Sequence, residues 1–367
     1  MTKGPGARGQ GPGYKRILIV RLDRIGDVVL STPVIRAVRE AYPESHIAVM
    51  VRPYAREIVE GNPYLNEVII YDKEGGHSGI VGNLRFIQEL KEKRFGLAII
   101  LHPTKRTHIV TSLAGIPERI GYNRKAGFLL TKSIPHTKQF GLKHEIDYAL
   151  DILRYMGMEP KTRELYMPVN SVCERRAEEL FKEHGIQAGD IVIAMNPGAS
   201  CSSKRWSIEK FADVANRLVA KHHAKIVVVA GRADKKCGDA LAARVAGDCL
   251  NLTGKTSVGD LASVLRRARL FISNDSGPVH IACAVNTPVI AIFGRSDRGL
   301  SPERWGPSGT RDVVLHKDAG CEICLAHNCR HGFRCLDSIT SDEVVRAADE
   351  MLLQAVKTVE TKKTFNT

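Results

Sequence analysis

The amino-acid sequence predicts an α/β protein made of two doubly wound units, each a parallel sheet flanked by helices. Short continuous apolar runs, typical of buried parallel strands, recur along the chain, and segments with helical apolar spacing separate them. The alternation loosens between residues 150 and 190 and starts afresh at residue 191. The length of 367 residues suits two domains of ordinary size.

In the first half, the apolar runs predict strands at residues 16–22, 47–51, 68–71 and 97–101. Thr32 and Pro33 mark a helix start, because proline is well tolerated in the first helical turn, and a second helix is expected at residues 87–93. We expect these elements to form an N-terminal domain over residues 15–170. Residues 1–14 are rich in glycine and proline, which predicts a disordered tail.

In the second half, the same patterns predict strands at residues 191–195, 225–230, 270–273 and 288–293, and helices at residues 174–184, 211–219, 261–268 and 278–285. We expect a C-terminal domain over residues 171–340. An amphipathic helix at residues 341–357 is expected to pack back toward the N-terminal domain. Doubly wound sheets bind ligands at the carboxyl ends of their strands, and a cleft between two such units is a favoured ligand site.

The composition points to an anionic partner and a reducing environment. The formal net charge of +14 favours a nucleic acid, a membrane surface or a phosphorylated ligand, and a charge that only keeps the protein soluble is the alternative. Nine cysteines without an export signal predict a cytoplasmic protein and no disulfide framework. The sequence contains no run of eighteen apolar residues, so no membrane span is predicted.

The turn after the first strand holds a single glycine, Gly26, whereas a dinucleotide fingerprint needs three at set spacing. This difference argues against an NAD or FAD enzyme. Asp27 follows at the junction of strand and helix, where a carboxylate can accept the proton of an attacking alcohol. The alternative is a helix-start aspartate that only satisfies backbone donors.

The loop at residues 196–206 predicts a phosphate contact. Its small residues follow a predicted strand, so a ligand can approach backbone amide groups there. Ser200 adds a hydroxyl donor, and Lys204 supplies a cation for phosphate oxygens. A basic surface turn without a ligand is the alternative.

The segment at residues 273–280 joins a buried strand to a buried helix. Ser276 can cap this helix, and Pro278 stands where a missing N–H has little effect. The amide groups around Ser276 and Gly277 point out of the helix N-terminus, which suits a diphosphate. His280 lies one turn into the helix and either contacts a ligand or belongs to the core.

Four cysteines lie within fifteen residues near the end of the second domain, with His327 and His331 between them. They are Cys321, Cys324, Cys329 and Cys335. Four thiolates can hold zinc tetrahedrally, which predicts a structural zinc site. The spacing is shorter and less regular than in common zinc motifs, so reduced thiols on a loop are the alternative.

Three segments in series resemble glycosyltransferase family 9, the ADP-heptose:lipopolysaccharide heptosyltransferases. They are residues 21–33, 196–206 and 274–280, and the likeness spans about residues 15–350. The resemblance implies the GT-B architecture, in which two Rossmann-like domains face a central cleft. The acceptor would bind the N-terminal domain, and the nucleotide sugar would bind the C-terminal domain.

The resemblance also implies roles for single residues. The aspartate of the family's Gly-Asp pair, the proposed base, corresponds to Asp27, and the phosphate-binding hydroxyl and lysine correspond to Ser200 and Lys204. The residues that grip the diphosphate and sugar correspond to Asp275, Ser276, Gly277 and His280. Some members have two adjacent hydroxyl residues where this chain has Ala199 and Ser200, so one phosphate contact is either missing or replaced by Ser202.

The implied reaction is an inverting transfer of heptose from ADP-L-glycero-D-manno-heptose to the inner core of lipopolysaccharide, with Kdo-lipid A or heptosyl-Kdo-lipid A as acceptor. Lys204 and the helix start at Ser276 would stabilise the leaving ADP, so no cofactor or catalytic metal is expected. The first half is the more basic one, which fits a phosphorylated acceptor. Its candidate acceptor contacts are Arg106, Arg119 and Arg124. Such an enzyme would be cytoplasmic and peripheral at the inner face of the inner membrane.

Two rival functions remain open. A transferase or an epimerase of the same architecture could use another sugar nucleotide, and binding of ADP against UDP separates these. A nucleic-acid-binding protein would fit the basic charge. The chain lacks an aromatic-interleaved basic stripe and a groove-reading motif, so no nucleic-acid partner is expected.

Overall fold

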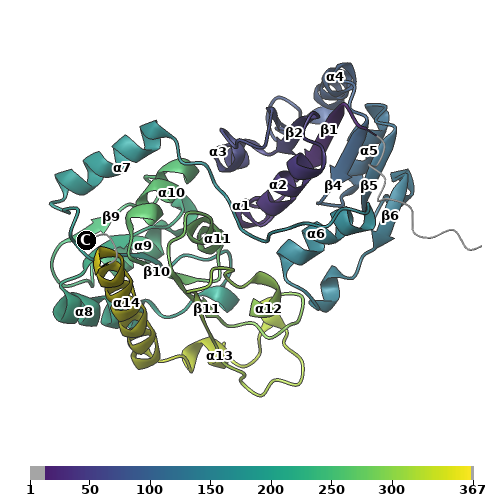
Figure 1. The fold of residues 1–367 in the computed structure, drawn as a ribbon. Helices are drawn as coiled ribbons and strands as arrows, with labels where there is room; N and C mark the ends of the chain where they lie inside the picture. The colour runs from purple at the N-terminus through teal and green to yellow at the C-terminus, as the bar shows by residue number, and fades with distance from the viewer. Residues whose placement is uncertain (1–12, 365–367) are drawn as a thin grey trace, which may run out of the picture. The chain divides into compact units, whose positions relative to one another are not determined.

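The computed structural model describes residues 13–364, without the side chains of residues 355–364. Contacts divide the described chain into two compact units (Figure 1). The first unit runs to His136 and resumes over Ile146–Arg163, and the second takes Thr137–Glu145 and the described chain from Glu164 onward. Most of the expected tail at residues 1–14 lies outside the described residues.

The first unit contains a parallel sheet with the strand order β3-β2-β1-β4-β5-β6. Its strands are β1 (Arg16–Val20), β2 (His46–Val51), β3 (Glu67–Ile70), β4 (Leu97–Ile100), β5 (Glu118–Asn123) and β6 (Lys132–Pro135). The central strand β1 pairs with β2 on one side and β4 on the other. It is apolar throughout because both faces are covered: Ile17, Leu18 and Ile19 are at most 1% exposed.

Helices lie on both faces of the sheet (Figure 1). The helices between its strands are α1 (Ile25–Val29), α2 (Thr32–Ala41), α3 (Arg56–Val59), α4 (Gly79–Glu92) and α5 (Lys105–Leu113), and α6 (Glu145–Tyr155) follows the last strand. Helices α4 and α5 cover the face that carries Leu18, Val20 and Ile100, and they form one apolar core with it. Short 3-10 turns lie at Pro53–Ala55 and Gly127–Leu129, and a third, Lys138–Phe140, falls in the segment that belongs to the second unit.

The second unit contains another parallel sheet, with the order β12-β11-β10-β7-β8-β9. Its strands are β7 (Val192–Asn196), β8 (Lys225–Val228), β9 (Cys249–Asn251), β10 (Leu270–Asn274), β11 (Val289–Phe293) and β12 (Val313–His316). Numbered from its own first strand, this sheet repeats the order of the first sheet. In both units the winding reverses between the first and fourth strands, which makes the ends of β1 and β4, and of β7 and β10, the expected ligand positions.

The helices of the second unit also lie on both faces of its sheet (Figure 1). They are α7 (Ser171–Glu183), α8 (Ile208–His222), α9 (Lys235–Ala242), α10 (Val258–Arg267), α11 (Gly277–Ala284), α12 (Pro302–Trp305), α13 (Arg334–Asp337) and α14 (Ser341–Thr364). Side chains of α8, α9 and α14 form one core with the strands, while α10 contacts α7 and α11.

The last helix, α14, packs on the second unit. Its buried side chains Val344, Val345, Ala348 and Leu352 belong to the core of that unit, and the helix lies along α8 (Figure 1). That the same helix also packs back toward the N-terminal domain stays a prediction. Among the described helices, none combines the length and apolar character that crossing a bilayer requires.

Candidate active site

Two asparagines join the loops that follow β7 and β10 at the switch point of the second sheet. Asn196 ends β7, and its Nδ2 donates to the Ser276 hydroxyl at 2.8 Å. Asn274 ends β10: its Nδ2 donates to the Pro197 carbonyl at 2.8 Å, and its Oδ1 accepts from the Trp206 N–H at 3.0 Å. These buried hydrogen bonds hold the two predicted phosphate loops against each other.

Ser276 occupies the N-cap position of α11, directly before Gly277 and Pro278. Its side chain makes no capping bond to the helix and bonds to Asn196 instead. The expected side-chain cap is therefore absent, and the hydroxyl ties the helix start to the neighbouring loop.

Three charged side chains with little exposure form a cluster at the same loops. Lys204 Nζ lies 3.0 Å from Oδ1 of Asp275, and the other carboxylate oxygen bonds to the guanidinium of Arg295. Burial lowers the pKa of Lys204 against the opposing effect of Asp275, and the charge of Arg295 lowers it further. One carboxylate between two cations leaves an excess of positive charge, which can accept a phosphate oxygen.

His280 lies in the first turn of α11 and is 5% exposed. Its Nδ1 is buried and has no hydrogen-bond partner within the described residues. Burial, with smaller effects from the nearby His144 and Lys204, lowers the pKa of His280 to about 3, so its ring is neutral near pH 7. A neutral imidazole with an unbonded buried nitrogen fits a ligand contact better than it fits a satisfied core histidine.

The loop after β7 is closed by Arg205, whose guanidinium donates to the Ala199 carbonyl at 2.8 Å and pairs with Asp234 at 2.8 Å. Gly198 is needed in this turn, because a Cβ atom there would lie 2.8–2.9 Å from the Asp234 side chain. Ser200 is exposed on the same loop. The structure thus brings Lys204, Asp275, Ser276, Gly277 and His280 together, with Ser200 on the adjoining loop.

In the first unit, Asp27 lies in α1 at the corresponding switch point. Its Oδ1 is 2.7 Å from Nη2 of Arg21, and its side chain is 15% exposed. The buried guanidinium of Arg21 also donates to the Leu101 carbonyl at 3.3 Å and lies 2.7 Å from Oδ1 of Asp23. Arg21 therefore anchors the loop after β1 to the end of β4 and orients the Asp27 carboxylate.

Two of the three expected acceptor arginines lie at the same edge of the first sheet as Asp27. Arg106 is exposed in the first turn of α5, and Arg124 is exposed directly after β5. The structure does not bring Arg119 together with them, because it is the second residue of β5 and so lies at the opposite, amino-terminal edge. Its guanidinium donates to the Leu129 carbonyl at 2.8 Å and holds a turn there.

Sequence reasoning missed two arginines and two asparagines of these sites: Arg21, Arg295, Asn196 and Asn274. Each lies at or just after the end of an apolar strand. A polar side chain in that position lies at the edge of the sheet where ligands bind. A polar residue directly after an apolar run is visible in the sequence and could have indicated these four residues.

Comparison with known proteins gives one family. The model of glycosyltransferase family 9 (heptosyltransferase) matches residues 83–333. Lipopolysaccharide heptosyltransferase 2 of Escherichia coli (strain K12) is 25% identical over 351 residues, which cover 92% of this chain and 99% of that protein.

Two solved structures resemble most of the chain. The glycosyl transferase family 9 protein of Veillonella parvula DSM 2008 has a TM-score of 0.85 at 28% identity, covering 93% of this chain and 98% of that one. E. coli ADP-heptose lps heptosyltransferase II has a TM-score of 0.76 at 22% identity, covering 93% and 99%. These likenesses confirm the α/β fold of two Rossmann-like domains, the GT-B class.

Proposed function

Because this chain belongs to glycosyltransferase family 9, the heptosyltransferases, we propose that it transfers a heptose from ADP-L-glycero-D-manno-heptose to the inner core of lipopolysaccharide. Kdo-lipid A or heptosyl-Kdo-lipid A would be the acceptor. The similar heptosyltransferase 2 (II) of E. coli supports this choice of substrates. It is named a lipopolysaccharide heptosyltransferase, and its solved structure is described as that of an ADP-heptose lps heptosyltransferase.

The cluster of Lys204, Asp275 and Arg295 is the observation that carries the proposal. Two cations meet at Asp275, directly before the start of α11, and Nδ1 of His280 has no hydrogen-bond partner among the residues that the structure describes. The diphosphate would lie against Lys204 and the amide groups at Gly277, where the helix N-terminus favours negative charge. Positive charge fixed in advance stabilises the leaving ADP as the glycosidic bond breaks, and in this proposal no metal ion is needed.

Asp27 is the proposed general base. The acceptor hydroxyl would attack the anomeric carbon and give its proton to the Asp27 carboxylate, while the bonding electrons leave with ADP. A single displacement of this kind inverts the anomeric centre. Arg21 holds the carboxylate at 2.7 Å in one orientation, and Arg106 and Arg124 are the proposed contacts for acceptor phosphates.

The Asp27→Asn variant tests the proposal. Replacing the base should lower the rate of ADP release in the presence of a truncated lipopolysaccharide acceptor by about 10²–10⁴-fold, the usual contribution of a general base. Stabilisation of the variant by ADP should match that of the unaltered chain, because the nucleotide site lies in the other unit.

Asp151→Asn is the matched control, since Asp151 forms a surface ion pair with Arg154 in α6, and it should keep full activity. A fully active Asp27→Asn would contradict the base assignment. Thermal stabilisation by UDP equal to that by ADP would contradict an ADP-sugar donor.

We also propose that the first unit docks on the anionic inner face of the inner membrane, where the acceptor lipid resides. Large apolar side chains are exposed on three adjoining elements, α4, α5 and the turn Gly127–Leu129. They are Ile80 (80% exposed), Val81 (71%), Leu84 (57%), Leu113 (57%) and Phe128 (84%). The neighbouring basic residues Lys105, Arg106, Arg124 and Lys125 are exposed too, and such a basic, apolar surface suits an anionic bilayer.

A further inference from the structure

The connection between β12 and α14, residues 317–340, has little regular structure. Its regular elements are the 3-10 turn Ala326–Asn328 and the four-residue helix α13. Ala326 and Phe333 have positive φ angles of 47° and 59°, which cost roughly 1–3 kcal/mol each for residues other than glycine. A long connection that stores strain needs a further constraint to fix one conformation.

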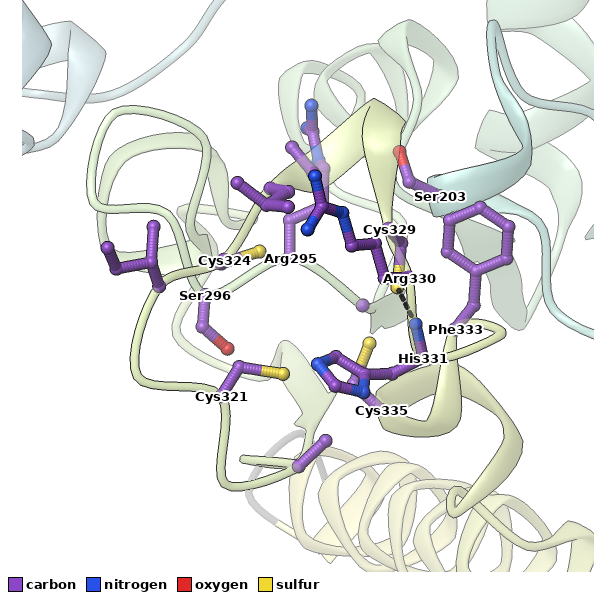
Figure 2. A pocket seen from close by; sticks show the side chains of 15 residues that line it. Ser203, Arg295, Ser296, Cys321, Cys324, Cys329, Arg330, His331, Phe333 and Cys335 are labelled. Atoms are coloured by element: carbon purple, nitrogen blue, oxygen red, sulfur yellow. Dashed lines mark hydrogen bonds between the residues drawn. The ribbon is translucent and has the colours of Figure 1, made fainter.

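Four cysteines of this connection line one cavity of roughly 40 Å³ (Figure 2). They are Cys321, Cys324, Cys329 and Cys335, all free thiols, and the ring of His331 lies beside them. A cavity of this size holds a single ion or very few water molecules. As they stand, no three metal-binding side chains of the described residues converge on one point, so closing on an ion requires rotation of the cysteine side chains.

Positively charged side chains in the wall of the cavity favour anionic ligands there. Arg295 and Arg330 line the same cavity. The Nε of Arg295 is buried, and within the described chain it has no hydrogen-bond acceptor. A thiolate ligand would supply one.

We infer that Cys321, Cys324, Cys329 and Cys335 bind one zinc ion as four thiolates. Zinc binds four sulfur ligands tetrahedrally at about 2.3 Å. Two cysteines separated by two residues, as Cys321 and Cys324 are, commonly begin such a site. Each thiol loses its proton on binding, so four protons are released and no electron is transferred. The resulting complex carries two negative charges, which Arg295 and Arg330 balance.

The zinc site would support the donor site, an inference that rests on the function proposed above. His327 Nδ1 lies 3.2 Å from the Ser203 hydroxyl. Ser203 is 2% exposed and lies in the turn Ser202–Lys204, which carries Lys204. Arg295 belongs both to the cavity and to the ion pair with Asp275. A bound metal would therefore fix the positions of two cationic donor-site residues, Lys204 and Arg295.

Metal analysis of the full-length chain tests the site. Protein purified in reductant, without a metal-affinity tag, should contain one zinc per chain by plasma mass spectrometry. The C321S/C324S double variant should retain less than about a tenth of that zinc, because two of four ligands are lost. The matched control is Cys237→Ser, because Cys237 is a free cysteine in α9 outside the cavity. This variant should keep the full zinc content.

If the double variant does not fold, the unaltered chain tests the zinc site instead. After a chelator has removed its metal, the unaltered chain should bind one equivalent of Co²⁺ and show the visible absorption of a tetrahedral thiolate complex. Disulfides among the four cysteines, bound iron in place of zinc, or full zinc content in the double variant would overturn the inference. These measurements do not depend on catalysis, so failure of the zinc site and failure of the transferase proposal are distinguishable.

Discussion

Lys204 carries its charge at a position where burial and a neighbouring guanidinium both lower its pKa. The carboxylate of Asp275 at 3.0 Å partly compensates for these effects. A diphosphate oxygen would add a second negative group to the cluster, and hydrogen bonds between an ammonium and a phosphate are stronger than those between neutral groups. The residue is therefore suited to binding the donor.

Lys204→Met should raise the KM for the sugar nucleotide by about 10–150-fold, the equivalent of one hydrogen bond to a charged group. The KM for the acceptor should change little, because that substrate is proposed to bind the other unit. Lys235→Met is the control, since Lys235 forms an exposed ion pair with Asp239. Steady-state kinetics with each substrate varied in turn would contradict the role of Lys204 if both KM values rose equally.

His280 predicts a dependence of stability on pH. Its pKa of about 3 in the folded chain lies below the ordinary value of 6.5, so between these values the unfolded chain binds one more proton than the folded chain. Its contribution is fully present above pH 6.5 and is lost as the pH falls toward 3. Urea unfolding should show this loss, up to about 1.4 kcal/mol per pH unit for one proton.

His280→Gln should lower the slope of stability against pH over this range. His184→Gln, at an exposed histidine after α7, should leave the slope unchanged. Identical slopes for His280→Gln and the unaltered chain would show that the ring is protonated in both states or in neither.

Among the secondary-structure elements, α14 shows how one face of a helix decides where it packs. Leu352 is 5% exposed within the core of the second unit, whereas its neighbour Leu353 is 60% exposed. Leu352→Ala should lower the free energy of unfolding by about 2–4 kcal/mol, because it leaves a cavity among packed side chains. Leu353→Ala should change it by less than about 0.5 kcal/mol. Equal effects in urea unfolding would contradict the placement of α14.

Strands that are buried on both faces and largely apolar, such as β1, β4, β10 and β11, could be predicted from the sequence. The edge strands β6, β9 and β12 could not, since they have only three or four residues and include polar ones. The internal strand β5 was also missed, because its sequence, ERIGYN, is largely polar. Helix α5 also escaped prediction. Its sequence, KRTHIVTSL, has no clear apolar stripe.

Residues of the candidate site could be named from the sequence where they lie together in one local segment. Asp27, Lys204 and Asp275 each follow a strand within one short motif. The roles of Arg21 and Arg295 depend on partners elsewhere in the chain: Arg21 bonds to Leu101, eighty residues away, and Arg295 to a carboxylate twenty residues away. Only the folded sheet brings these strand ends together.

At the scale of the whole molecule, the exposed apolar surface of the first unit predicts membrane binding. The full-length chain should sediment with vesicles that contain phosphatidylglycerol and should bind more weakly as salt increases, because the basic residues contribute. The triple variant I80S/V81S/F128S should bind at least about tenfold more weakly, since each side chain gains roughly 1.5–3 kcal/mol on burial.

Val172→Ser provides the control, because Val172 is 53% exposed but lies on α7 of the second unit. The triple variant should keep its activity on a soluble, truncated acceptor. Unchanged vesicle binding in that variant, or equal binding to uncharged vesicles, would contradict the docking surface.

The segment Thr137–Glu145 belongs by its contacts to the second unit, although in sequence it follows β6 of the first unit and ends on the first residue of α6. Within it, Glu145 binds Lys138 at 2.6 Å and Arg304 at 2.8 Å. A hybrid that takes the chain up to α6 from one relative and the rest of the second unit from another would separate Arg304 from its native carboxylate. A hybrid that folds therefore has to take this nine-residue segment from the same relative as the second unit.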